Sequence, residues 1–241
     1  MQGSTLNTMW PHQSKVQKYV CVYPSSFNFS FCRLQSYVET WTLQVLPLDL
    51  KELDISAPLS EIPRSIGQLK KLQRISICNH FQAVTVKRLP DEFCHLRSLK
   101  YLIFKGFSKL VSLPVSFGEL NNLQLMDLEG ASSLLTLPNS FGNLTRLKHL
   151  SLRGCENLTI DNGTFGDIKM LEHLDLSSCS QLIVLPPQVA HQRSLQQLYL
   201  QETKLKEFPS FIGDLCNLEV LHIRLPPSVR YSEGLEEVQV P

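Results

Sequence analysis

The sequence lacks the motifs that mark common enzyme and nucleotide-binding sites. Its 241 residues contain no G-x-x-x-x-G-K-[ST] phosphate loop and no G-x-G-x-x-G dinucleotide segment. They also contain no G-x-S-x-G, no H-E-x-x-H, and no H-R-D or D-F-G of the kinase type. Single His, Cys and Asp residues occur, but none has a motif context that would make it a nucleophile or a base. We therefore expect a protein that is not an enzyme and holds no cofactor.

An excess of charge and a long apolar run are also missing. Lys and Arg together number 23 against 22 Asp and Glu, so no long-range attraction to nucleic acid or acidic lipid is expected. No apolar run approaches the ~18–20 residues that a membrane-spanning helix needs. Residues 1–18 carry Gln, Asn, His and Lys where a secretory signal needs a continuous apolar segment. These absences favour a cytoplasmic protein whose partners are neither nucleic acid nor membrane.

The cysteines show no pairing pattern. They are odd in number and include no C-x-x-C, which favours reduced structural thiols over a disulfide scaffold or a zinc site. The seven are Cys21, Cys32, Cys78, Cys94, Cys155, Cys179 and Cys216. N-x-[ST] sequons keep an extracellular location open as an alternative, because they act as glycosylation sites in secreted chains. These sequons begin at Asn28, Asn143, Asn157 and Asn162.

What the sequence does contain is a repeat. The pattern L-x-x-L-x-L, with Ile, Phe or Met at some leucine positions, recurs at intervals of 22 to 27 residues. It begins at Leu50, Leu72, Leu99, Leu123, Leu147, Leu171, Leu195 and Leu218. Met126 and Leu128 are two residues apart and therefore point the same way from a strand, whereas Asp127 and Glu129 point the other way. Each repeat thus predicts one short strand with an apolar face and a polar face.

The second half of each repeat predicts an outer wall. A proline follows an apolar residue in most repeats, as at Pro114 and Pro138, and prevents a long strand because it cannot donate to a sheet ladder. One such unit cannot bury its apolar face alone, but stacked units share a continuous core. The spacing therefore predicts an α/β fold, a leucine-rich-repeat solenoid. We expect a horseshoe arc with a parallel concave sheet and a convex wall of loops and short helical turns.

Three segments carry a family resemblance. LPVSFGELNNLQLMDLEGASSL, LPNSFGNLTRLKHLSLRGCENL and LEHLDLSSCSQLIVLPPQV resemble the repeats of plant disease-resistance proteins, the intracellular nucleotide-binding, leucine-rich-repeat immune receptors. Cys155 and Cys179 occupy the Asn/Cys position that follows the strand in that family. The resemblance covers roughly residues 43–225. Because no phosphate loop is present, the receptors' ATP binding is not carried over.

The resemblance implies a protein-recognition module in plant defence and signal transduction. Such a region senses a ligand or keeps the receptor autoinhibited, and its partner is an effector, a host target or another domain of a longer receptor. Two alternatives stay open at this point. One is an extracellular receptor-type repeat domain, and the other is a general scaffold with no immune role.

Both ends depart from the repeat. Residues 1–42 form an atypical segment, residues 43–225 hold about eight repeats, and residues 226–241 form a tail or truncated end. The alternation Phe27-x-Phe29-x-Phe31 predicts a strand with one buried face. The N-terminal segment is interpreted as a cap over the first core layer or as a separate ligand or membrane contact. The tail either folds over the last layer, or the natural protein continues beyond Pro241.

Three internal departures are interpreted as loop drift, because loops tolerate change. The 27-residue repeat holds CNHFQAVTVKRLP, an insertion predicted to bulge after its strand. Gln192 stands where other repeats place leucine or isoleucine, and Asn162 with Gly163 replaces the proline step.

The candidate binding residues are those that face outward from the strands. Exposed Tyr, Arg and His on one rigid face suit a protein-binding patch, because aromatic residues and Arg dominate interface energies. The competing interpretation is an ordinary solvated sheet face. The candidates are Tyr101, Lys105, Asp127, Glu129, His149, Arg153, His173, Asp175, Tyr199 and His222. His149 and His173 fall on adjacent strands, but two or three ligands without cysteine make a weak site, so no metal is expected.

Overall fold

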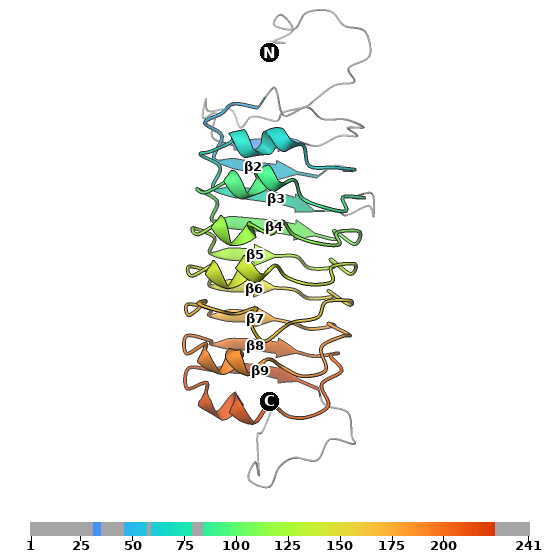
Figure 1. Ribbon diagram of the computed structural model, residues 1–241, viewed down its shortest axis with the longest axis vertical. Helices are drawn as coiled ribbons and strands as arrows, with labels where there is room; N and C mark the ends of the chain where they lie inside the picture. The colour runs from blue at the N-terminus through green and yellow to red at the C-terminus, as the bar shows by residue number, and fades with distance from the viewer. Residues whose placement is uncertain (1–30, 35–45, 57–58, 79–83, 225–241) are drawn as a thin grey trace, which may run out of the picture.

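The computed structural model describes residues 31–34, 46–56, 59–78 and 84–224. Within these ranges, nine parallel strands form one sheet whose spatial order follows the chain (Figure 1). The strands are β1 (Phe31–Leu34), β2 (Glu52–Ile55), β3 (Arg74–Cys78), β4 (Tyr101–Lys105), β5 (Leu125–Asp127), β6 (His149–Ser151), β7 (His173–Asp175), β8 (Gln197–Leu200) and β9 (Val220–Ile223). Each of the eight repeats supplies one strand, β2 to β9, which confirms the predicted parallel stack. β1 comes from the segment before the repeats and pairs in parallel with β2.

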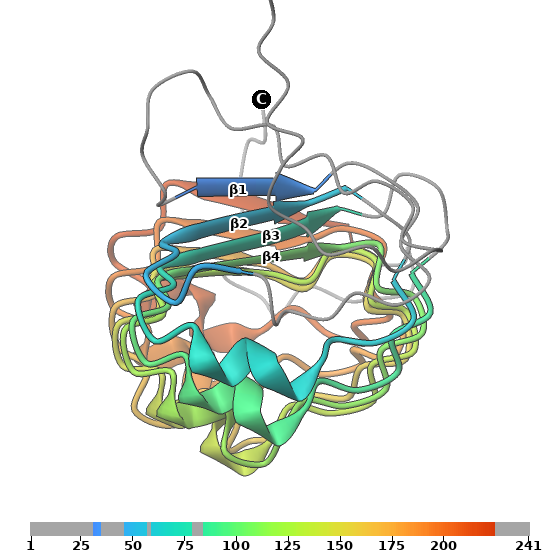
Figure 2. The same ribbon diagram turned by 90° about the horizontal axis from the view of Figure 1, so that it is seen from above.

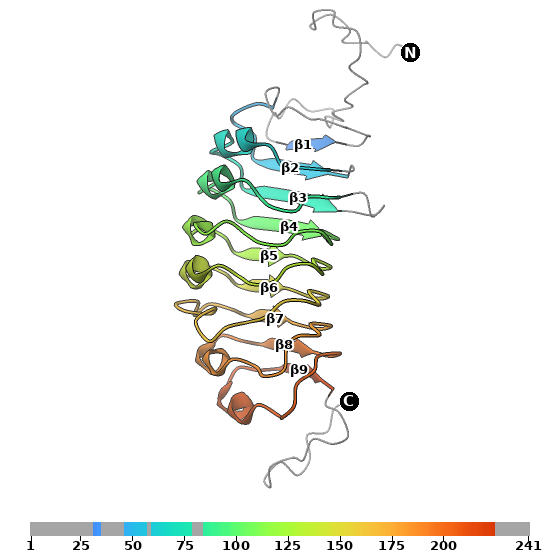
Figure 3. The same cartoon turned by 45° about the vertical axis from the view of Figure 1, so that its right-hand side comes forward.

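Short 3-10 helices line the opposite wall. They are η2 (Arg64–Gln68), η3 (Asp91–His95), η4 (Phe117–Glu119), η5 (Asn139–Asn143), η6 (Pro187–His191) and η7 (Ser210–Asp214). Most begin directly after the recurring proline, whose fixed φ suits a helix start. Seen from above, the sheet and the helices lie on opposite sides of each coil (Figure 2). The stack curves with the sheet on the concave side, as expected (Figure 3).

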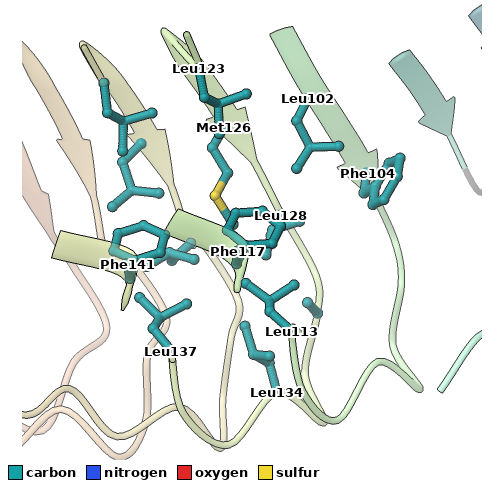
Figure 4. Packing of buried hydrophobic residues seen from close by; sticks show 14 of the residues in the cluster. Leu102, Phe104, Leu113, Phe117, Leu123, Met126, Leu128, Leu134, Leu137 and Phe141 are labelled. Carbon is teal, nitrogen blue, oxygen red and sulfur yellow. The ribbon is translucent and has the colours of Figure 1, made fainter. Parts of the chain in front are cut away.

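The core lies between these walls. Leu123, Met126 and Leu128 point inward from the sheet and are fully buried. They meet Phe117 from the outer wall, whose ring stacks on Phe141 of the next coil with centroids 6.5 Å apart (Figure 4). Each coil therefore contributes one layer to a shared core, because its side chains pack against the coils above and below.

After each of the strands β5 to β8, one residue of the turn has a left-handed backbone conformation. Gly154 has a φ of +70°, which a residue with a Cβ adopts at a cost of roughly 1–2 kcal/mol. The same position is also left-handed at Gly130, but Ser178 and Glu202 occupy it in later repeats. There the amides of Gly154 and Ser178 donate to carbonyls of the following coil. The turn therefore links successive coils whether or not the residue is glycine.

Gln192 has a structural role that the sequence did not suggest. Its side chain is buried, and Nε2 donates to the carbonyl of Ile168 at 2.6 Å. In other repeats the corresponding carbonyl accepts the amide three residues on, as Leu144 accepts from Leu147. At Ile168 the side-chain amide of Gln192 donates to this carbonyl instead. The interpretation of Gln192 as loop drift is therefore wrong, because its side chain replaces a backbone hydrogen bond.

Two cysteines follow β6 and β7, at the position after the strand that the sequence predicts. Cys155 and Cys179 are buried, and their thiols donate to the carbonyls of Leu128 and Leu152. Cys216 is exposed. The predicted bulge after β3 falls at residues 79–83, and most of residues 1–42 and the tail also lie outside the described ranges.

Candidate protein-binding surface

The outward residues form two straight rows across the concave face. In the first row the strand register aligns Tyr101, Leu125, His149, His173 and Gln197. In the second row it aligns Asp127, Ser151, Asp175, Tyr199 and His222. Neighbouring strands in a sheet lie about 4.8 Å apart, so residues of one row touch their successors. The rows therefore bring together seven of the ten candidates. The other three lie at or beyond strand ends: Lys105 ends β4, and Glu129 and Arg153 follow β5 and β6.

Four rings in these rows make a continuous series, which we call the ring ladder: His149, His173, Tyr199 and His222. The centroids of successive rings are 6.0, 5.2 and 5.0 Å apart. These spacings lie within the range of favourable aromatic contact. The ladder therefore crosses β6 to β9 as one aromatic strip on the concave wall.

Two glutamines hold the ladder in place. His173 Nδ1 lies 3.0 Å from Gln197 Oε1, which also accepts the Tyr199 hydroxyl at 3.4 Å. Gln201 Nε2 lies 2.7 Å from His222 Nδ1. With these amide orientations, His173 donates from Nδ1 and His222 accepts at Nδ1. Side chains fixed in this way lose little conformational entropy when a partner binds.

An ionic cluster lies beside the ladder, at the ends of β4 and β5. Lys105 Nζ is 2.8 Å from Glu129 Oε2 and 3.0 Å from Asp127 Oδ2. The hydrogen bond with Glu129 is the main reason that the pKa of Lys105 lies above its usual range, so this side chain stays charged. Asp127 also accepts the backbone amide of Glu129 at 3.0 Å. These three candidates are therefore largely engaged with one another.

Asp175 has a similar local role. Its Oδ1 accepts the backbone amide of Ser177 at 2.8 Å, which fixes the turn that ends β7. Arg153 differs, because it is exposed and makes no side-chain hydrogen bond or ion pair with any described residue. Tyr101 is also exposed, at 39%. Arg153 and Tyr101 are thus the candidates with most freedom to contact a partner.

A shallow depression lies between these groups. It is lined by Leu125, Met126, Asp127, His149, Ser151 and His173. Leu125 is the apolar side chain that faces outward there, among the polar side chains of Asp127, His149, Ser151 and His173.

The described residues contain no group of three or more His, Cys, Asp or Glu side chains that could hold a metal ion. His149 instead contacts Glu172, with Nε2 and Oε2 4.0 Å apart. Across the same ranges, no helix is long and apolar enough to cross a membrane.

Comparison with solved structures identifies the fold. A leucine-rich-repeat protein of Leptospira interrogans superposes with a TM-score of 0.61 and is 28% identical, over 76% of this chain and 44% of its own. The chain is a leucine-rich-repeat solenoid. It spans less than half the length of that protein. No protein-family model and no curated protein matches it.

Two further solenoids are more distant. The leucine-rich-repeat domain of the type III effector XopL is 22% identical with a TM-score of 0.48, over 74% of this chain and 70% of its own. A plant peptide hormone receptor in complex with RGF2 is 21% identical with a TM-score of 0.47, over 80% of this chain and 35% of its own. At this similarity neither adds to the assignment.

Sequence reasoning missed some polar residues of the solenoid's concave wall. Gln197 and Gln201 were outward positions but lacked the charge or aromatic ring that singled out the other candidates. Glu172 precedes its strand, yet its carboxylate pairs with Lys148 at 2.7 Å and lies near His149. Polar residues next to histidine in a predicted row are the signal that would have found them.

Proposed function

We propose that the solenoid is a protein-recognition module and that it binds its partner on the concave wall. The ring ladder with Arg153 carries this proposal. Aromatic rings and arginine supply most of the binding energy of protein interfaces, and here they lie on a rigid sheet. The core does not require these side chains, because the inward leucines of the same strands fill it.

The finer proposal is a role in plant-type intracellular immunity, as the ligand-sensing or autoinhibitory repeat region of a receptor or as a stand-alone relative. The resemblance of the segments around Cys155 and Cys179 to those receptors supports it. The partner would be an effector, a host target or another domain of the same receptor. A full-length transcript that encodes an upstream phosphate loop would support this role, whereas one that encodes a signal peptide and a membrane span would contradict it.

The test of the binding surface compares two triple variants. The concave variant replaces Tyr101, Arg153 and Tyr199 with alanine, and the outer-wall control replaces Glu119, Asn143 and Asp167. A partner captured from plant extract with the wild-type solenoid is then titrated against all three proteins. We expect the concave variant to lose more than ~2 kcal/mol of binding free energy while circular dichroism stays unchanged. Loss of affinity in the outer-wall control alone would contradict the proposal.

An extracellular receptor domain is the second candidate, because the sequons are accessible. Asn143, Asn157 and Asn162 are all exposed. Asn157 Nδ2, however, donates to the Ser132 carbonyl at 2.8 Å, a contact that a glycan would disturb. Expression through a secretory pathway separates the two candidates. Efficient glycosylation with retained folding would favour the extracellular one, and misfolding would favour the intracellular one.

A further inference from the structure

One side of the solenoid carries two rows of outward side chains, where each coil passes from the end of its strand to the outer wall. Backbone hydrogen bonds between coils set the first row, since the amide of Leu135 donates to the carbonyl of Val111. Equivalent bonds extend the row to Lys87 at one end and Lys206 at the other. The first row is therefore Lys87, Val111, Leu135, Thr159, Ile183 and Lys206.

The second row lies one residue further along each coil. Its register is given by the parallel bridge between Arg88 and Ser112. It consists of Arg88, Ser112, Thr136, Ile160, Val184 and Glu207. Both rows lie beside the concave wall and share no residue with it.

The middle of the two rows is apolar. Leu135 is 51% exposed, Ile183 40% and Val184 54%. The hydroxyl of Thr159 donates to the carbonyl of Leu135 at 3.1 Å, which leaves its methyl group to face outward. We call this region the side strip: Val111, Leu135, Thr159, Ile160, Ile183 and Val184. Single exposed apolar residues are ordinary, but a strip aligned over successive coils marks an interaction surface.

Basic side chains lie at both ends of the side strip. Lys87 and Arg88 are exposed at one end. At the other end, Lys204 and Lys206 are exposed and outnumber Glu207. A partner that matches this surface therefore has an apolar face with an acidic group near each end.

The backbone of the strip favours a helix over an extended strand as the partner. The first row has already used its amides and carbonyls in bonds between coils, as between Leu135 and Val111. An added strand depends on such groups, whereas a helix satisfies its own backbone and binds through side chains.

The dimensions of the strip also fit a helix. Neighbouring coils are about 4.8 Å apart and one helical turn rises about 5.4 Å, so a helix along the strip places roughly one turn on each coil. The five coil steps from Lys87 to Lys206 span about 24 Å, which is the length of a helix of about 16 residues.

We propose that the side strip binds an amphipathic helix of a protein partner. The apolar face of this helix covers the strip, and carboxylates near its two ends pair with Lys87 or Arg88 and with Lys206. This site is separate from the ring ladder, so the proposal does not rest on the function proposed for the concave wall.

A designed peptide tests the chemistry of the partner. The probe is a fluorescein-labelled helical peptide of about 16 residues, with leucines spaced as on one helix face and glutamates near both ends. In the comparison peptide, lysines replace the glutamates. In fluorescence anisotropy with the full chain, the glutamate peptide should bind at least about tenfold more tightly. Equal affinity of the two peptides, or no saturable binding of the glutamate peptide, would overturn the proposal.

A matched pair of double variants tests the location. Leu135→Ser with Ile183→Ser removes two side chains of the strip, and the core does not need them because Leu134 and Leu182 beside them are buried. Leu48→Ser with Val115→Ser removes two apolar side chains that are 63% and 81% exposed elsewhere.

Thermal melts by circular dichroism should show that both double variants stay folded, because exposed positions tolerate such changes. The strip variant should bind the glutamate peptide at least about tenfold more weakly, and the control should stay within about twofold of the wild type. An equal loss in the two variants would overturn the assignment of the site.

A charge reversal tests the two ends. Lys87→Glu with Lys206→Glu should make the chain prefer the lysine peptide, because the attraction at both ends changes sign. A preference that stays with the glutamate peptide would contradict the proposed placement.

An acidic lipid surface and a second copy of the chain are the other occupants to exclude. Asp161, which follows Ile160 and is exposed, disfavours an acidic surface, and two facing strips would bring basic ends together. We expect no cosedimentation with vesicles of phosphatidylcholine and phosphatidylserine, and a monomer in analytical ultracentrifugation. Vesicle binding or a dimer that the Leu135→Ser, Ile183→Ser variant loses would overturn the proposal of a helix.

Discussion

The imidazole of His173 lies 5.2 Å from the phenol ring of Tyr199, and both side chains reach the Oε1 atom of Gln197. One amide oxygen thus orients two neighbouring rings that come from different strands. The two rings behave as a unit, because moving either one changes the hydrogen bonding of the other.

A double-mutant cycle should detect this unit. His173→Ala and Tyr199→Ala are expected to show a coupling free energy of about 0.5–1 kcal/mol in unfolding, near the lower part of the range for aromatic pairs because both are partly exposed. The control cycle uses His149 and His222, which are not in contact. Additive effects in the first cycle, measured by urea titration, would show that the rings are independent.

Leu150 provides the test of inward and outward positions. It is fully buried at the centre of the stack, so Leu150→Ala should lower the free energy of unfolding by roughly 2–5 kcal/mol. Leu135 is 51% exposed, and Leu135→Ala should lower it by less than about 1 kcal/mol. Denaturant titration of both variants decides the matter, and comparable losses would contradict the described packing.

At the left-handed positions, adding a Cβ and removing one should have opposite effects on the stability of the protein. Gly154→Ala should destabilise the protein by roughly 1 kcal/mol, since a Cβ there makes only ordinary contacts and the effect is conformational. Glu202→Gly relieves the same strain at a φ of +57°, against the loss of an exposed hydrogen bond from Ser178. We expect it to be neutral or stabilising by up to ~1 kcal/mol. Thermal melts in which both variants lose stability equally would refute this account.

Gln192→Leu restores the residue type of the other repeats and should nevertheless destabilise the chain. The substitution removes the donor for the Ile168 carbonyl, and an unpaired group of this kind costs about 1–3 kcal/mol. The glutamine's own Oε1 has no described partner, which favours the lower end. A gain in stability in the denaturant titration would show that apolar packing outweighs the hydrogen bond.

Thiol reactivity should separate the cysteines. Burial raises the pKa of Cys94 from 9.0 to about 11 and that of Cys179 to about 12. Both should therefore resist iodoacetamide at pH 8.5, whereas the exposed Cys216 should react at once. A raised folded-state pKa keeps the native form favoured below pH 9, and this contribution is lost as the pH rises toward 11. Mass spectrometry of the alkylated chain measures the order, and early modification of Cys179 would contradict it.

The periodic part of the fold could be predicted from the sequence because a two-residue alternation decides which face each side chain takes. Met126 and Asp127 follow from that rule alone, and so do the rows of candidate residues. The left-handed Ser178 and Glu202 could not be predicted, since neither residue type favours that conformation. The hydrogen bonds that join Gln197 to His173 and Gln201 to His222 could not be predicted either. They depend on rotamers and amide orientations that only the neighbouring coils define.

Each coil rests only on the coil before and the coil after it, so the solenoid opens from its ends. A partner that contacts both His149 and His222 would bridge four consecutive coils. Opening the C-terminal coils would then require release of that partner as well as loss of the stacking. Binding across β6 to β9 would therefore slow the opening of the C-terminal coils, a response that needs no change in the shape of the molecule.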